Sequence, residues 1–294
     1  MANPTGTRKL LAIVALVPVA VACTTLPERD QDRAIDAPLL DAPALAQLPG
    51  EYATSVARGD DEPPVMLEIR ETMSDRRDLG YILTQRRSGE NERRFLITLE
   101  QATLDGNRVD GGFAPLNADG QVRRECAMRF SVRPDGLSGE TDPQECSFGE
   151  GDQATGLLKE IAFDGRQLVI GDRLVRLADG SPAADDVIQA FYPIRRFSAW
   201  AGRREGGAWQ QAEAFELHSG ASRVEPVDAA GMSLDLIVTL TRYRMGDEAG
   251  TDILRLSVSD RETGEVLAQS WADPDAESLG VAGPGVQIGL ERIN

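Results

Sequence analysis

The amino-acid sequence predicts an all-β protein made of short antiparallel strands. Runs rich in Val, Ile, Leu, Phe and Thr, such as RFLITL at 94–99, recur along the chain between Asp-, Arg- and Gly-rich turns. The Asp-Gly pairs at 135–136 and 164–165 are typical of tight hairpins. Strands that recur about every 8–12 residues indicate a barrel or a sandwich, because a sheet that alternates with helices needs longer connections.

A single short helix is expected ahead of the strands. Asp41 is placed to cap a helix over residues 42–48, and Pro43 falls in its first turn, where a proline removes no helical hydrogen bond. The pair Pro49-Gly50 then ends the helix. Everything after this point has the pattern of strands.

The strands are expected to form two consecutive antiparallel units without an internal repeat. The first unit, a barrel over residues 39–200, is completed by a strand at 196–201, and residues 201–294 form a smaller second unit. The expected strands of the first unit are 65–70, 79–84, 94–99, 126–132, 136–141, 157–163, 167–170, 173–177 and 196–201, and those of the second are 208–217, 234–243, 253–259, 265–271 and 286–293.

The N-terminus has the pattern of a bacterial lipoprotein signal over residues 1–22. A basic pair at 8–9 precedes an apolar run that is too short to cross a membrane, and the run ends in AVAC at 20–23. These last four residues resemble a lipobox, which predicts that Cys23 is acylated and becomes the first residue of the mature chain. The alternative is an ordinary signal peptide with a chance cysteine. Residues 23–38 are expected to be a flexible tether.

The charge and the predicted anchor limit the possible partners. Thr24 is not the Asp that resembles an inner-membrane retention signal, so we expect the chain on the periplasmic face of the outer membrane, held by its lipid. Loss of Arg8 and Lys9 with the signal takes the formal net charge from −17 to −19. Such an acidic body repels phosphate backbones and anionic headgroups, which argues against nucleic-acid and peripheral membrane binding. The sequence does not predict the oligomeric state.

The remaining cysteines are expected to form a disulfide. Cys126 and Cys146 are an even pair in an oxidising compartment, and the bond would stabilise the fold by about 3 kcal/mol. A redox or metal-binding role would need CxxC spacing or nearby histidines. The chain has one histidine, His218, so a histidine-rich zinc site is excluded, and the acidic segments at 60–62 and 149–152 are interpreted as turns. We therefore predict no metal and no cofactor.

Two further features bear on chemistry. Glu100-Gln101 follows an apolar strand, and because side chains alternate along a strand only one of the two can face the interior, where an acid is costly without a partner. Glu100 is therefore a candidate acid, and the alternative is an outward ladder of Arg and Glu that includes Arg123, Arg124 and Arg129. Lys9 and Lys159 are the only lysines, and every other basic residue is arginine.

Several short motifs follow one another in a recognisable order. They are LPGEY at 48–52, LEQA at 99–102, Cys126, GLSGET at 136–141, Cys146, GDR at 171–173 and DG at 179–180. Their order resembles the CpcT/CpeT chromophore lyase family over residues 41–200. The resemblance implies a lipocalin-like barrel, a chromophore lyase activity, and ligand-binding roles for Tyr52, Glu100 and Gln101. The family's Pro-Tyr-Arg-Gln-Arg segment has no counterpart here, and the family acts in a cytoplasm, which argues against this activity.

Three functions remain open at this point. The leading hypothesis is a non-enzymatic envelope protein that binds a small apolar or amphipathic ligand in the mouth of the barrel. The first alternative is a lyase or isomerase of a tetrapyrrole-type ligand, with Glu100 as proton donor. The second is a structural or assembly lipoprotein that docks an envelope partner through an edge strand of the second unit.

Overall fold

A computed structural model describes residues 42–57, 62–73, 78–246 and 250–293. The predicted signal sequence, Cys23, the tether, Asp41 and the acidic pair 60–61 lie outside these ranges. Within them, nearly all regular structure is β, as predicted, and no helix has the length and apolarity needed to cross a membrane.

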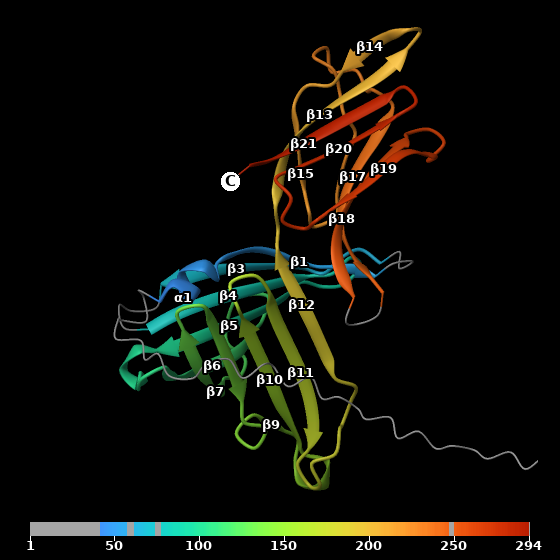
Figure 1. Cartoon of the computed structure of the whole chain (residues 1–294). Coiled ribbons are helices and arrows are strands. Elements are labelled where there is room, and N and C mark those ends of the chain that lie inside the picture. Colours follow the sequence, from blue (N-terminus) through green and yellow to red (C-terminus); the bar gives the residue numbers. More distant parts are fainter. Residues whose placement is uncertain (1–41, 58–61, 74–77, 247–249, 294) are drawn as a thin grey trace, which may run out of the picture. The chain divides into compact units, whose positions relative to one another are not determined.

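The first unit is a closed barrel of ten antiparallel strands (Figure 1). Each strand pairs with its neighbours, and the β10–β11 ladder, which runs from Thr155↔Arg176 to Phe163↔Leu168, is part of the closed ring. The strands are β1 (Gly50–Thr54), β3 (Met66–Met73), β4 (Asp78–Arg86), β5 (Arg93–Glu100), β6 (Arg108–Leu116), β7 (Cys126–Arg133), β8 (Gly136–Thr141), β10 (Thr155–Phe163), β11 (Leu168–Arg176) and β12 (Val187–Pro193).

The barrel is an up-and-down meander, which closes where the first strand, β1, pairs with the last, β12, as well as with β3. The two-residue strand β9 (Ser147–Phe148) adds to β10. Alternation sets the inward face: along β7, Cys126, Met128, Phe130 and Val132 are buried. Side chains from all around the ring form one hydrophobic core, and each fully buried large apolar side chain contributes about 1.5–3 kcal/mol.

The short helix α1 (Pro43–Gln47) precedes the first strand. Its N-cap is Ala42, which has no polar side chain, and the predicted cap residue Asp41 lies outside the described residues. Leu45 and Leu48 pack into the barrel core, and the hydroxyl of Tyr81 donates to the carbonyl of Leu45 at 3.3 Å. The helix is therefore fixed by its apolar side chains and by tyrosine hydroxyls that donate to the carbonyls near its end.

The predicted hairpin at 164–165 is present between β10 and β11. Gly165 has φ +81°, and the Asp164 carboxylate accepts the backbone N–H groups of Arg166 and Gln167 at 2.9 and 2.7 Å. This is the role for which an Asp-Gly pair is suited, since glycine takes a positive φ without strain.

The second unit contains two five-stranded sheets that share one core. One sheet has the order β14-β13-β21-β20 with β15 also on β13, and the other has the order β16-β17-β18-β19 with β2 parallel to β17. The strands are β2 (Val56–Ala57), β13 (Arg196–Glu205), β14 (Ala208–Gln211), β15 (Phe215–His218), β16 (Ser222–Val224), β17 (Leu236–Met245), β18 (Thr251–Asp260), β19 (Val266–Ala272), β20 (Ser278–Gly283) and β21 (Val286–Ile293).

The strand expected at 196–201 belongs to this second unit and not to the barrel. It is the first part of β13, which pairs with β14, β15 and β21, so the boundary drawn at residue 200 falls inside a strand. Phe197, Ala199 and Ala201 face the core between the two sheets. Alternation predicts that such a strand exists, but it does not say which sheet the strand joins.

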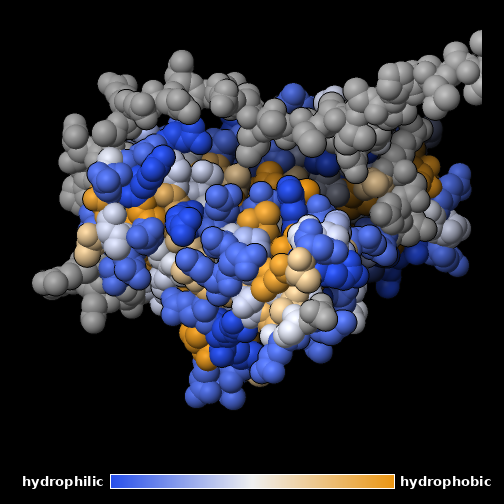
Figure 2. Space-filling model, turned by 90° about the horizontal axis from the view of Figure 1, so that it is seen from below, coloured by the Kyte–Doolittle hydropathy of each residue, from blue (hydrophilic) through white to orange (hydrophobic). Residues whose placement is uncertain are grey.

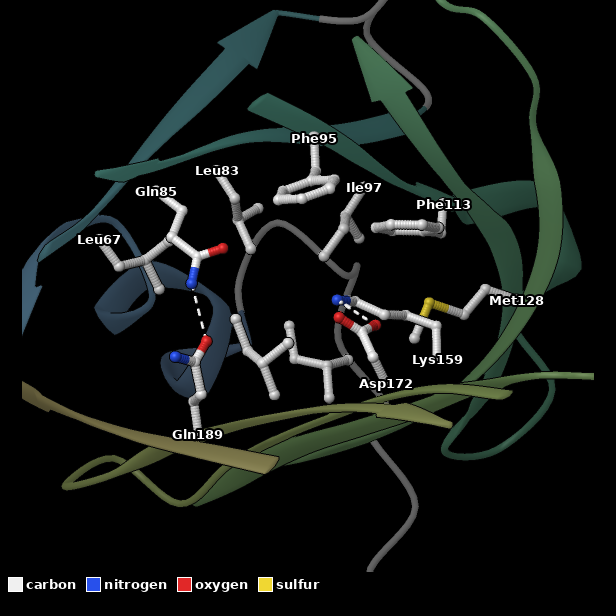
Figure 3. A pocket seen from close by; sticks show the side chains of 12 residues that line it. Leu67, Leu83, Gln85, Phe95, Ile97, Phe113, Met128, Lys159, Asp172 and Gln189 are labelled. Atoms are coloured by element: carbon white, nitrogen blue, oxygen red, sulfur yellow. Dashed lines mark hydrogen bonds and ion pairs between the residues drawn. The ribbon is translucent and has the colours of Figure 1, made fainter. Parts of the chain in front are cut away.

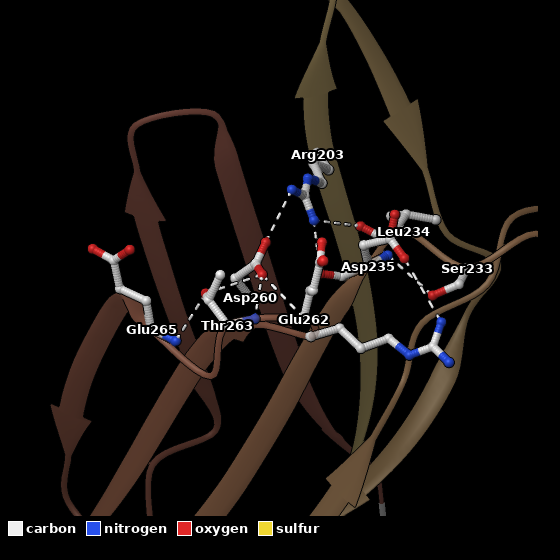
Figure 4. A network of polar contacts seen from close by, with 9 residues as sticks. Arg203, Ser233, Leu234, Asp235, Asp260, Glu262, Thr263 and Glu265 are labelled. Carbon is white, nitrogen blue, oxygen red and sulfur yellow. Dashed lines mark hydrogen bonds and ion pairs between the residues drawn. The ribbon is translucent and has the colours of Figure 1, made fainter.

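A polar network connects the two sheets of this unit (Figure 4). Arg203 of β13 donates to the carbonyls of Leu234 and Asp235 at 3.0 and 2.7 Å, and to the carboxylate of Asp260, at the end of β18, at 3.1 Å. Asp260 also accepts the backbone N–H of Thr263, and this bond is the main reason why the pKa of its carboxyl is lowered. One guanidinium thus satisfies two loop carbonyls and an acid.

Candidate functional site

The barrel encloses one polar site in an apolar interior (Figure 3). The space open to the centre of a water molecule is about 20 Å³, which is room for about one water. The interior is therefore filled mainly by side chains. The apolar residues that line the pocket are Leu67, Leu83, Phe95, Ile97, Phe113, Met128, Ile161 and Ile170, and the polar ones are Gln85, Lys159, Asp172 and Gln189.

Lys159 is the central residue of this site. On β10 it shares the inward face with Ile161 and Phe163, and its side chain is only 7% exposed. Asp172 is its direct partner across the β10–β11 ladder, and the Lys159 Nζ lies 2.7 Å from the Asp172 Oδ1. Register alone therefore brings the ammonium to its counter-charge.

Two aromatic rings complete the environment of the ammonium. The Lys159 Nζ lies 5.2 Å from the ring centroid of Phe95 and 5.1 Å from that of Phe113, and the two rings stack with centroids 5.5 Å apart. A cation beside two partly desolvated ring faces gains about 0.5–2 kcal/mol. The site thus stabilises the charged form with one carboxylate and two π faces.

Burial opposes this stabilisation. Desolvation is the largest effect on Lys159 and lowers the pKa of its ammonium, while the carboxylate of Asp172 acts in the other direction. The side chain of Asp172 is 42% exposed, so the pair reaches solvent at its acidic end. A second anion that arrives from solvent could replace Asp172 at the ammonium without crossing the core.

A second polar pair spans the interior. The Gln85 Nε2 on β4 donates to the Gln189 Oε1 on β12 at 2.7 Å. Figure 3 shows the Gln85–Gln189 pair and the Lys159–Asp172 pair on opposite sides of the pocket, with apolar side chains between them. This arrangement suits a molecule with an acidic group, a short apolar body and a second polar group.

The structure does not bring the predicted ligand-binding residues into this pocket. Tyr52 is buried in the core, where its hydroxyl donates to the carbonyl of Leu48 at 2.8 Å, and burial raises its pKa to about 12. Glu100 is exposed at the last position of β5, and Gln101 begins the short 3₁₀ helix η2 (Gln101–Thr103). The strand ends at this acid, so alternation does not continue inward.

Cys126 and Cys146 lie at bonding distance, as the sequence predicts. Their Cα atoms are 5.0 Å apart, and both residues are buried. The bond ties the start of β7 to the segment before β9. His218 ends β15, as expected, and no cluster of three or more His, Cys, Asp or Glu in the described part of the chain is placed to hold a metal.

Sequence reasoning missed Lys159, Asp172, Gln85 and Gln189. The available signal was Lys159, the one lysine outside the predicted signal sequence, which alternates with apolar residues in the expected strand 157–163. Its placement two residues before Ile161 puts it on the buried face.

No protein-family model and no curated protein matches the chain. The all-β barrel stands on the structure alone, and membership of the CpcT/CpeT family stays a prediction from short motifs.

Proposed function

We propose that the chain is an outer-membrane lipoprotein, anchored through Cys23, whose barrel binds a small amphipathic molecule with an anionic group. The observation that carries the proposal is Lys159, a buried ammonium paired with a half-exposed carboxylate inside an otherwise apolar barrel.

Stability alone does not account for a cation at this position. Replacing a buried ion pair by apolar side chains is often neutral or stabilises the fold by about 1–4 kcal/mol. Relative to apolar side chains the pair therefore adds no stability, and a role in binding would explain its presence. A ligand carboxylate at Lys159 would take the place of Asp172, which is free to turn toward water.

The small free volume sets a condition on this function. Because the interior has room for about one water, a ligand larger than its acidic group must separate the Gln85–Gln189 pair. A neutral hydrogen bond contributes about 0.5–1.5 kcal/mol, so opening it is a modest cost. We therefore propose a ligand of a few carbon atoms, rather than a long chain or a large rigid ring system.

The filled interior also favours a second candidate, a structural lipoprotein that docks an envelope partner through the second unit. In that case the barrel is a scaffold, and Lys159 specifies its packing. The lyase alternative has less support, since Glu100 is exposed and outside the residues that line the pocket.

Matched probes with and without a charge test the binding proposal. Butanoate and 1-butanol share one short apolar tail, and their binding to the mature chain can be compared by calorimetry. We expect Lys159→Met to weaken butanoate about tenfold or more and to leave 1-butanol within about threefold, because hydrogen bonds to a charged group contribute about 1.5–3 kcal/mol.

The control for this experiment is Arg108→Met, which removes an exposed cation from β6 without touching the pocket. Equal binding of both probes by Lys159→Met and the unchanged protein would contradict an anion site at Lys159. Absence of any small-molecule binding, together with co-purification of an envelope protein, would favour the docking function.

A further inference from the structure

All three tryptophans of the chain are exposed, and all lie in the second unit. Trp200 is 50% exposed, Trp209 46% and Trp271 45%. Large aromatic side chains are usually buried, so exposed ones that share a face indicate an interaction surface. Trp200 and Trp209 share the outer face of the sheet β14-β13-β21-β20, whereas Trp271 is on β19 of the other sheet.

The register shows how this outer face is built. Since Phe197, Ala199 and Ala201 point into the core, the alternate residues of β13, Trp200 and Gly202 among them, point outward. Trp209 lies opposite Arg204, four residues along β13 from Trp200, which is about 13 Å at the usual rise per residue.

Each indole lies across a glycine. A Cβ added to Gly289 would lie 2.3 Å from the Nε1 of Trp200, and one added to Gly202 would lie 3.4 Å from the Cε3 of Trp209. The glycines therefore leave room for the rings to lie on the sheet instead of standing away from it. About half of each tryptophan stays open to solvent.

The positions between and beside the two rings are polar. Gln211 and Gln287 pair with Gly202 from the two neighbouring strands, and both side chains are exposed. Amides both donate and accept hydrogen bonds, as hydroxyl groups also do. The surface consists of two separate indole rings with amides between them and the exposed Arg204 opposite Trp209, rather than one continuous apolar patch.

We propose that this face, defined by Trp200, Trp209, Gln211 and Gln287, binds a flat, uncharged polysaccharide of the β-1,4-linked type. A sugar ring has an apolar C–H face, which matches an exposed indole, and a rim of hydroxyls, which matches the amides. Rings that lie on one sheet suit an extended ribbon of sugars. A protein hot spot instead inserts an aromatic side chain into a pocket, which rings held against glycines cannot do.

The net charge of −17 is consistent with an uncharged polymer, because polyanions are repelled. This proposal is independent of ligand binding in the barrel.

The test uses chitohexaose in calorimetry and insoluble chitin in a pull-down, with the mature chain and single variants. We expect Trp200→Ala and Trp209→Ala each to weaken binding about tenfold or more, as truncation of a central aromatic contact does. Trp271→Ala is the matched control, since it removes an equally exposed tryptophan from the other sheet, and binding should stay within about twofold. Dextran, which is not a flat ribbon, should not bind.

A second variant keeps both tryptophans. Gly289→Ala places a methyl group where the indole of Trp200 lies, so we expect binding to weaken severalfold with the circular dichroism spectrum unchanged. Failure of the unchanged protein to bind chitin, cellulose and peptidoglycan sacculi would overturn the proposal. An equal loss in Trp271→Ala would also overturn it, as would capture of a protein, in place of a polysaccharide, through Trp200 and Trp209.

Discussion

For the ion pair inside the barrel, we predict that loss of the acid costs more stability than loss of the base. At the 2.7 Å separation of Lys159 and Asp172, an effective dielectric constant of about 20 gives a gross attraction of about 6 kcal/mol. Desolvation of the ammonium and solvent screening of the half-exposed carboxylate remove most of this energy. We therefore expect a net loss of about 2 kcal/mol when the carboxylate is neutralised in Asp172→Asn.

The reverse substitution should cost less. Lys159→Met keeps most of the apolar stem and removes the buried charge, and the remaining Asp172 can turn to water. We expect its free energy of unfolding to lie within about 1 kcal/mol of the unchanged protein, and we expect Lys159→Met to rescue Asp172→Asn in the double variant.

Urea unfolding at pH 7, followed by far-ultraviolet circular dichroism, measures these differences. Asp110→Asn, an exposed acid on β6, is the matched control and should change the free energy of unfolding by less than about 0.5 kcal/mol. If Lys159→Met is the more damaging change, or if the double variant shows no rescue, the burial of an otherwise unpaired ammonium is not the dominant cost and the reasoning fails.

Three other measurements test separate parts of the molecule. Labelled palmitate should appear in the protein and disappear in Cys23→Ser, and label that persists would contradict the lipobox. Non-reducing mass spectrometry of a tryptic digest should find Cys126 linked to Cys146, and the double serine variant should be about 3 kcal/mol less stable; two free thiols in periplasmic protein would be the contrary result. Finally, burial raises the pKa of Tyr52 from 10 to about 12, so its contribution to stability is complete below pH 10 and is lost as the pH rises to 12. Between pH 9 and pH 12, the free energy of unfolding should fall by about 3 kcal/mol less in Tyr52→Phe than in the unchanged protein. An equal fall in both proteins would refute the assignment of this pH dependence to Tyr52.

Much of the fold could be predicted from the sequence because strands with one buried face leave a period-two pattern. The strands around 94–99 and 126–132 are examples, and both lie where they were expected. Strands without that pattern were missed. Strand β6 contains two glycines, and β12 exposes its apolar residues Val187 and Ile188. Strand β20 consists mostly of small residues, so it shows no clear apolar alternation.

The candidate site was harder to predict than the fold. Asp172 falls between the expected strands 167–170 and 173–177, and it meets Lys159 because the hairpin at 164–165 sets the register of the single strand β11 against β10. Gln85 and Gln189 come from strands 104 residues apart, and β12 was not expected. Glu100 was a candidate because an acid beside an apolar run is costly when it is buried. Strand β5 ends at Glu100, however, and its side chain is exposed. A local sequence pattern shows which residues of one strand share a face. A site also depends on which strands pair across the barrel, and the local pattern does not show this.

The scarcity of lysine has a practical consequence for measuring motion. Lys159 is the one lysine beyond the predicted signal sequence, so it would be the single side-chain amine of a processed chain, and it is enclosed in the barrel. Its modification rate would therefore report how often the barrel opens locally, as amide hydrogen exchange does for backbone groups. The same reaction, followed while candidate molecules are added, would detect occupancy of the interior as protection of one side chain, with no engineered label.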